Sequence, residues 1–212
     1  MLKVMLLYPE RERCKVLTAF RELPEGLKPE ARVTLVSCRR RLEGPRTIVS
    51  GGTVVITLPA EGDLTSVKLS LAHELAHALQ AERGVLPGRV PPLRALSLPL
   101  ECGAEELVLK FIPGSVGRRV EMGLRLVRRM VPRDFLTDLE RSLVLEPVRM
   151  AVERLGERVS VPRVEPVSRR AREVREELVR AAREVDPWDP LSVRRYVEDA
   201  RAIVSAALRR GA

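Results

Sequence analysis

The sequence of 212 residues contains only three cysteines, which lie far apart and form no C-x-x-C pair. This spacing excludes a disulfide framework and a thiolate zinc site. Aromatic residues make up 3% of the chain, so the core is expected to be aliphatic and single-stranded nucleic acid finds few rings for stacking. The sequence also lacks an apolar stretch long enough to cross a bilayer and the features of a signal peptide. We therefore expect a cytoplasmic protein that makes no contact with a membrane.

Charge is abundant, with an excess of +9, but it is spread evenly along the chain. Residues 1–112, 113–150 and 151–212 each carry a net charge of +3, and the only basic triplet is Arg39-Arg40-Arg41. Most other arginines alternate with glutamates, a pattern typical of solvated helix faces with ion pairs four residues apart. Because binding along a phosphate backbone needs a concentrated basic surface, this spread disfavours a nucleic-acid partner.

Strand patterns are confined to the first part of the chain. Runs of β-branched residues predict strands at 4–8 and 32–37 and a hairpin at 47–58 around Gly51-Gly52. Apolar residues at helical spacing predict a helix at 11–21 and a long helix from Asp63 or Thr65 to Arg83. The prolines between 84 and 99 predict an ordered loop. Further helices are expected at 100–111, 116–130, 133–155, 168–185 and 190–209.

The long predicted helix contains His73-Glu74-Leu75-Ala76-His77, an H-E-x-x-H motif that includes both histidines of the chain. Four residues are about one helical turn, so the two imidazoles share a face and can bind one tetrahedral metal ion. Glu74 directly follows the first histidine, which places its carboxylate beside the metal rather than on it. There it can accept a proton from a metal-activated water as that water attacks a carbonyl carbon. The motif therefore predicts a catalytic zinc site.

A tetrahedral catalytic zinc needs a third protein ligand, and carboxylates of the next predicted helix can supply it. Glu101 and Glu105 are four residues apart and share a helix face, while Glu106 is turned by about 100° from Glu105. One of the three can ligate the metal, and another can accept the free N–H of a ligand imidazole. The residues alone leave this choice open.

The H-E-L-A-H sequence, followed 24 residues later by E-C-G-A-E at 101–105, resembles the gluzincin zinc metallopeptidases, and among them the small soluble minigluzincins. The resemblance implies that His73, His77 and Glu101 bind zinc. It also implies that Glu74 is the general base and acid, and that Glu105 supports the first histidine.

The resemblance covers roughly residues 47–112 and has two further implications. The strand at 53–58 is expected to be the sheet edge that pairs with an extended peptide substrate. Family members commonly stabilise the oxyanion with a Tyr or His on a later helix, and Tyr196 in the last predicted helix is the candidate for this role here.

We therefore predict an α+β fold with two parts. Residues 1–112 are expected to form a zincin-like core, in which a small sheet with its hairpin packs on the H-E-x-x-H helix, and residues 113–212 a mainly helical subdomain. The expected activity is that of a zinc-dependent endopeptidase acting on peptide or protein substrates. Two alternatives remain open: a zinc-binding regulatory or protein-interaction module with weak or no turnover, and a DNA-associated metallopeptidase.

Overall fold

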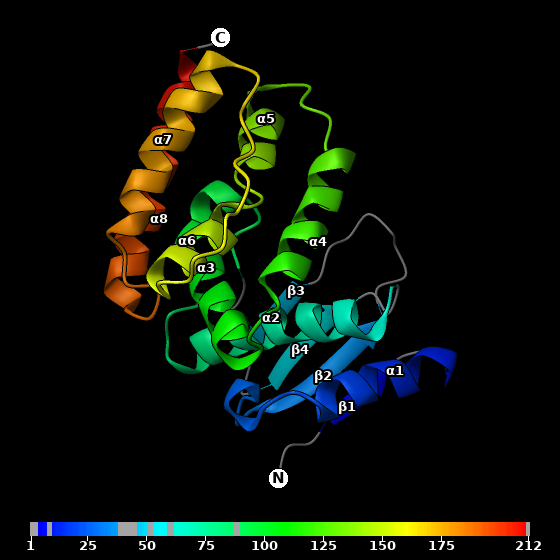
Figure 1. Ribbon diagram of the computed structural model, residues 1–212. Coiled ribbons are helices and arrows are strands. Elements are labelled where there is room, and N and C mark those ends of the chain that lie inside the picture. Colours follow the sequence, from blue (N-terminus) through cyan, green and yellow to red (C-terminus); the bar gives the residue numbers. More distant parts are fainter. Residues whose placement is uncertain are drawn as a thin grey trace.

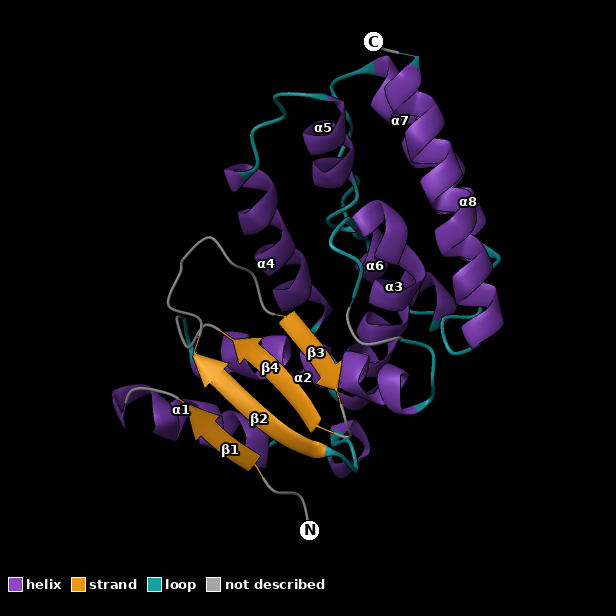
Figure 2. Cartoon of the chain, turned by 180° about the vertical axis from the view of Figure 1, so that it is seen from behind, coloured by secondary structure: helices purple, strands orange, loops and turns teal. Residues whose placement is uncertain are grey.

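The computed structural model describes residues 4–7, 10–37, 46–50, 53–58, 62–86 and 90–210. Its strands form one mixed sheet in the order β1-β2-β4-β3. They are β1 (Val4–Leu7), β2 (Arg32–Ser37), β3 (Arg46–Ser50) and β4 (Thr53–Leu58). Strands β1, β2 and β4 run parallel, and β3 is antiparallel to β4 (Figure 2). The predicted strands and the pairing of the hairpin are confirmed, while Tyr8 and the turn Gly51-Gly52 lie outside the described residues.

Strand β4 lies inside the sheet, between β2 and β3. The expectation that 53–58 forms the edge is therefore wrong, because the first arm of the hairpin, β3, pairs on its outer side. Among the described strands, β3 has a hydrogen-bonded neighbour on one side only. The backbone edge on this side of the sheet belongs to 46–50.

Helices α1 (Glu10–Arg21) and α2 (Leu64–Glu82) lie on the same face of the sheet (Figure 2). Alternate strand residues turn toward them and are buried: Val33, Leu35, Val54, Ile56 and Leu58. The predicted long helix is confirmed as α2. It begins where the Asp63 carboxylate accepts a hydrogen bond from Ser66 N at 2.7 Å. A short 3-10 helix, η1 (Glu25–Leu27), precedes β2.

Helix α3 (Arg94–Phe111) begins earlier than predicted, within the stretch expected to be a loop up to residue 99. Pro99 lies inside the helix and has no N–H, which leaves the Ala95 carbonyl without its helical partner. The Tyr196 hydroxyl donates to that carbonyl at 2.8 Å. At the start of α3, the Glu140 carboxylate accepts hydrogen bonds from Arg94 N at 2.8 Å and Ala95 N at 3.1 Å. Side chains from distant helices thus stabilise α3.

In the described part of the chain, further helices follow α3 (Figure 1). They are α4 (Val116–Arg129), α5 (Phe135–Ser142), α6 (Glu146–Arg154), α7 (Arg169–Arg183) and α8 (Pro190–Arg209). The single helix predicted at 133–155 is wrong, since it is divided into α5 and α6. Pro147 lies in the first turn of α6, where its missing N–H costs no helical hydrogen bond but prevents continuation from α5.

The fold is α+β, with two clusters of buried apolar residues. One joins the sheet, α1 and α2, with Val108 of α3. The other joins residues of α3 to those of α4–α8. Because α3 contributes to both clusters, it ties the sheet layer to the helices, and the division of the chain after residue 112 stays a prediction. Within the described part of the chain, no helix combines the length and apolar character needed to cross a membrane.

The helical cluster contains a buried ion pair between Glu146 of α6 and Arg175 of α7, each with a side chain 1% exposed. Glu146→Ala is expected to lower the free energy of unfolding by about 3–5 kcal/mol, because it leaves the buried Arg175 guanidinium without its hydrogen-bonded carboxylate and also removes the partner of Arg149. Urea-induced unfolding measures this loss. Glu173→Ala, which removes the exposed partner of Arg169, is the control and is expected to change stability little. Equal stability of the two variants would contradict the assignment.

Candidate metal centre

Helices α2 and α3 bring His73, His77 and Glu101 together. The two imidazoles lie one helical turn apart on α2, with ring centroids 4.8 Å apart. The Glu101 carboxylate lies between them, with Oε2 at 3.0 Å from His73 Nε2 and Oε1 at 3.7 Å from His77 Nε2. One potential ligand atom from each residue lies within 4.8 Å of the others. Two imidazole nitrogens and one carboxylate therefore face a common point.

The spacing of these atoms fits a small metal ion. A tetrahedral zinc ion with bonds of about 2.0–2.2 Å holds its ligand atoms about 3.3–3.6 Å apart. The distances of 3.0 and 3.7 Å from the Glu101 oxygens to the two Nε2 atoms bracket that range. Imidazole nitrogen with carboxylate oxygen is also a donor set that zinc accepts. The group can bind a metal ion once its ligand atoms, which lie within 4.8 Å of one another, move closer together.

The Nδ1 atom of His73 points away from the common point, toward Glu105. Glu105 Oε1 lies 3.1 Å from Nδ1, and Arg119 Nη2 lies 3.2 Å from the same nitrogen. A guanidinium can only donate hydrogen bonds, so an Nδ1–H can be accepted only by Glu105. Arg119 of α4 in turn donates to both Glu105 oxygens, with Nε at 2.8 Å from Oε2. This chain of contacts fixes the His73 ring with Nε2 toward Glu101.

The Nδ1 atom of His77 has a partner on its own helix. Gln80 Oε1 lies 2.7 Å from His77 Nδ1, and Gln80 Nε2 donates to the Leu100 carbonyl at 2.8 Å. Because the amide nitrogen faces a carbonyl, the amide oxygen must face His77 and accept its Nδ1–H. The Nε2 lone pair of His77 is then free to face Glu101.

Glu74 is buried between α2 and the sheet. The single hydroxyl hydrogen of Thr47, on β3, is shared between two acceptors of Glu74: Oε2 at 2.7 Å and the carbonyl oxygen at 2.9 Å from Oγ1. The Glu74 carboxylate is also close enough to Arg119 to help raise the pKa of the guanidinium, although burial opposes this. Thr47 of the edge strand β3 therefore holds Oε2 of the Glu74 carboxylate, and Oε1 is the oxygen that does not contact Thr47.

The surroundings of the site favour positive charge. Burial alone would lower the pKa of His73, but Glu105 and Glu101 raise it to about 10. Burial alone would raise the pKa of Glu105, but Arg119 and His73 lower it to about 2. Hydrogen bonds to the histidines likewise hold the pKa of Glu101 well below its ordinary range, against the effect of burial.

The formal charges give the same result. Three carboxylates, those of Glu74, Glu101 and Glu105, act on the single guanidinium of Arg119. Their sum is a net charge of −2 in the ligating state, in which both imidazoles are neutral and His73 has released the proton that its raised pKa favours. A divalent cation would neutralise this charge, and buried unbalanced charge is costly. The site is therefore electrostatically matched to a divalent ion.

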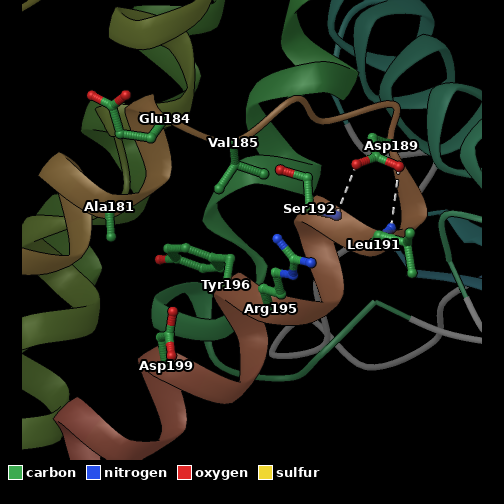
Figure 3. A pocket seen from close by; sticks show the side chains of 9 residues that line it. All are labelled: Ala181, Glu184, Val185, Asp189, Leu191, Ser192, Arg195, Tyr196 and Asp199. Atoms are coloured by element: carbon green, nitrogen blue, oxygen red, sulfur yellow. Dashed lines mark hydrogen bonds between the residues drawn. The ribbon is translucent and has the colours of Figure 1, made fainter.

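Two residues considered from the sequence lie elsewhere. Glu106 is bound by Arg154 at 3.1 Å and by Cys102 Sγ at 3.7 Å, so its carboxylate is engaged away from the histidines. Tyr196 is buried on α8 with its hydroxyl on the Ala95 carbonyl, and burial raises its pKa. It lines a surface pocket of about 440 Å³ whose lining includes none of the clustered histidines and glutamates (Figure 3). The described contacts do not bring Tyr196 to the metal cluster.

Three contacts of the site were missed in the sequence. Thr47 and Arg119 reach it only through tertiary packing, from β3 and α4. Gln80 carries a local signal, because a residue three positions after His77 lies on the same helix face.

Compared with known proteins, the chain matches no family model, no curated protein and no solved structure. The chemistry of the site is therefore inferred from its own geometry.

Proposed function

We propose that the protein is a zinc-dependent metallopeptidase whose metal is bound by His73, His77 and Glu101. The observation that carries this proposal is the convergence of two Nε2 atoms and one carboxylate, with the buried Glu74 directly following the first of these histidines in α2. A site that only stabilises the fold gains nothing from a general base next to the metal. The small mixed sheet with α2 on one face supports a zincin-like core.

The residues around the site divide the chemical work. Zinc held by His73, His77 and Glu101 would supply Lewis acidity there and would lower the pKa of water to near neutral. Glu74 accepts a proton from the attacking water and passes it to the amine that leaves. Thr47 orients the Glu74 carboxylate, and Glu105 and Gln80 hold the imidazoles in the ligating tautomer.

The substrate class follows from the edge strand. Strand β3 has one unpaired side among the described strands, and its Thr47 contacts Glu74. An extended peptide that adds to this edge would be held by backbone hydrogen bonds close to the general base. We therefore assign peptide or protein segments in extended conformation as the substrate, bound along β3 rather than β4.

Elemental analysis of protein purified without a histidine tag or added metal tests the proposal. About one zinc per chain is expected, together with cleavage in a peptide library that stops when the metal is removed. Zinc without cleavage would favour the regulatory or interaction module. Failure to take up zinc at all would overturn the proposal.

Zinc binding should also stabilise the fold, because the ligands come from two helices that must dock. At a zinc concentration about 100 times Kd, the expected gain of about 2.7 kcal/mol raises Tm by about 5–10 °C in a chain of this size. Differential scanning calorimetry of metal-free and zinc-loaded protein measures the shift. Mg²⁺, which prefers oxygen ligands, is the control and should leave Tm unchanged.

Thr47→Val tests the contact between the edge strand and the general base. The variant keeps the side-chain shape but removes the hydrogen bond to Glu74 Oε2, so kcat is expected to fall about tenfold with unchanged zinc content. Thr47→Ser should retain most activity. Thr57→Val, on the opposite face of the sheet, is the matched control. Equal kcat for T47V and the wild type would exclude this role of Thr47.

A further inference from the structure

Gln80, the hydrogen-bond partner of His77, is held by contacts at both ends of its amide group. Gln80 is fully buried, and its amide connects His77 Nδ1 at 2.7 Å to the Leu100 carbonyl at 2.8 Å. Both amide positions are fixed by these contacts, since a flipped amide would place oxygen against a carbonyl. Gln80 therefore determines which nitrogen of His77 carries hydrogen.

Gly103 of α3 provides the space in which Gln80 lies. A Cβ at this position would lie 2.9 Å from Gln80 Nε2, and 2.8 and 3.2 Å from Pro187 Cβ and Cγ. Such distances require a neighbour to move. Glycine here allows α3, the Gln80 amide and Pro187 to approach one another closely.

Pro187 belongs to the turn between α7 and α8, and this turn is anchored on both sides. Trp188 stacks on the Arg83 guanidinium at the end of α2, 4.6 Å from the ring centroid. Arg154 at the end of α6 donates to the Val185 carbonyl at 2.7 Å. The turn therefore packs against the region behind His77.

We propose that Gln80 is the positioning residue of His77, and that Gly103 and Pro187 hold Gln80 in place. The turn between α7 and α8 is then a part of the metal centre, although none of its residues binds the metal. This inference rests on the proposed zinc site and adds a requirement for residues more than 100 positions away from the motif.

Zinc affinity, measured by competition with a chromophoric chelator, tests the role of Gln80. Gln80→Met keeps a side chain of similar length without either hydrogen bond and is expected to weaken zinc binding about 10–100-fold. Gln80→Glu keeps an acceptor for His77 and should bind zinc more tightly than Gln80→Met. A role in packing alone would not give this order, because methionine fits a buried site better than a carboxylate.

Gly103→Ala tests the space around the amide. It is expected to weaken zinc binding at least tenfold, because the new methyl displaces Gln80. Gly117→Ala is the matched control, since it also lies in a helix and its Cβ would meet nothing within 4 Å. Combining Gly103→Ala with Pro187→Gly should recover part of the zinc affinity. The new methyl group at position 103 can then occupy the space that the Pro187 ring leaves, instead of displacing Gln80. If the losses of zinc affinity in the two single variants simply add in the double variant, Pro187 does not help to hold Gln80 in place.

The Co²⁺-loaded protein gives a readout that does not depend on activity. The visible absorption of Co²⁺ should change in Gln80→Met and Gly103→Ala but not in Gly117→Ala, because the bands report the ligand geometry. If wild type binds zinc and Gln80→Met matches it in affinity and in the Co²⁺ spectrum, the inference is wrong and the proposed function stands. If the wild type binds neither ion, the proposed function fails first. Gln80→Met alone decides the question should Gly103→Ala not fold.

Discussion

Replacing Glu101 by alanine is expected to abolish zinc binding at concentrations that saturate the wild type. Glu101 is the only carboxylate that contacts the Nε2 side of both histidines, at 3.0 and 3.7 Å, among the described residues. Its loss leaves two neutral nitrogens and no anionic ligand. The loss in affinity should therefore exceed the roughly 10–100-fold effect of removing an outer hydrogen-bond partner of a ligand. Chelator competition and elemental analysis measure it.

Glu106→Ala is the matched control for Glu101→Ala. Glu106 lies on the same helix and is also partly buried, but it pairs with Arg154 instead of a histidine. Zinc affinity should stay within a few-fold of the wild type in this variant. If Glu101→Ala retained zinc at wild-type affinity, the third ligand would have to be reassigned, with Glu105 as the next carboxylate beside His73.

The parts of the site that follow from one helical turn could be predicted from the sequence. The spacing of His73 and His77 fixes their common face wherever α2 packs. The same spacing puts Glu101 and Glu105 on one face of α3, although spacing could not tell which of them faces both imidazoles. That distinction depends on how α2 and α3 dock, and the structure brings Glu101 to the Nε2 atoms and Glu105 to Nδ1 of His73.

The contacts that orient these groups could not be predicted in the same way. Arg119 belongs to an arginine-rich helix, and only the packing of α4 selects it over its neighbours. Thr47 was correctly placed in a strand, but its contact with Glu74 depends on the position of β3 at the outer side of the hairpin. Local patterns fix elements, whereas these contacts depend on the arrangement of elements.

Two of the errors in the predicted fold have one cause in common. Pro99 was expected to exclude a helix, yet the Tyr196 hydroxyl provides the Ala95 carbonyl with the hydrogen bond that proline removes. The strand order could not be predicted from the sequence either, because a hairpin can pair with the rest of a sheet through either of its two strands. In both cases a partner distant in sequence determines the local outcome. This same fact explains why Tyr196 is engaged in the helical cluster instead of at the metal centre.

Glu74→Gln is expected to keep zinc and lose peptidase activity. Glutamine retains the oxygen that accepts from Thr47 Oγ1, so the side chain can stay where the structure places it. It cannot accept a proton from water, and general-base catalysis contributes about 10²–10⁴-fold to rate. The variant should therefore bind zinc with wild-type affinity and show kcat lower by at least a hundredfold on the peptide cleaved best by the wild type.

The matched control is Glu82→Gln, at the exposed end of the same helix, where an amide oxygen can still accept from Ala31 N. It should cleave as the wild type does. A Glu74→Gln variant with undiminished kcat would show that another group accepts the proton, and the proposed mechanism would be wrong. Zinc binding lost along with activity would instead indicate that Glu74 supports the ligands. Only loss of cleavage with the metal retained separates a hydrolytic site from a metal site that serves binding alone.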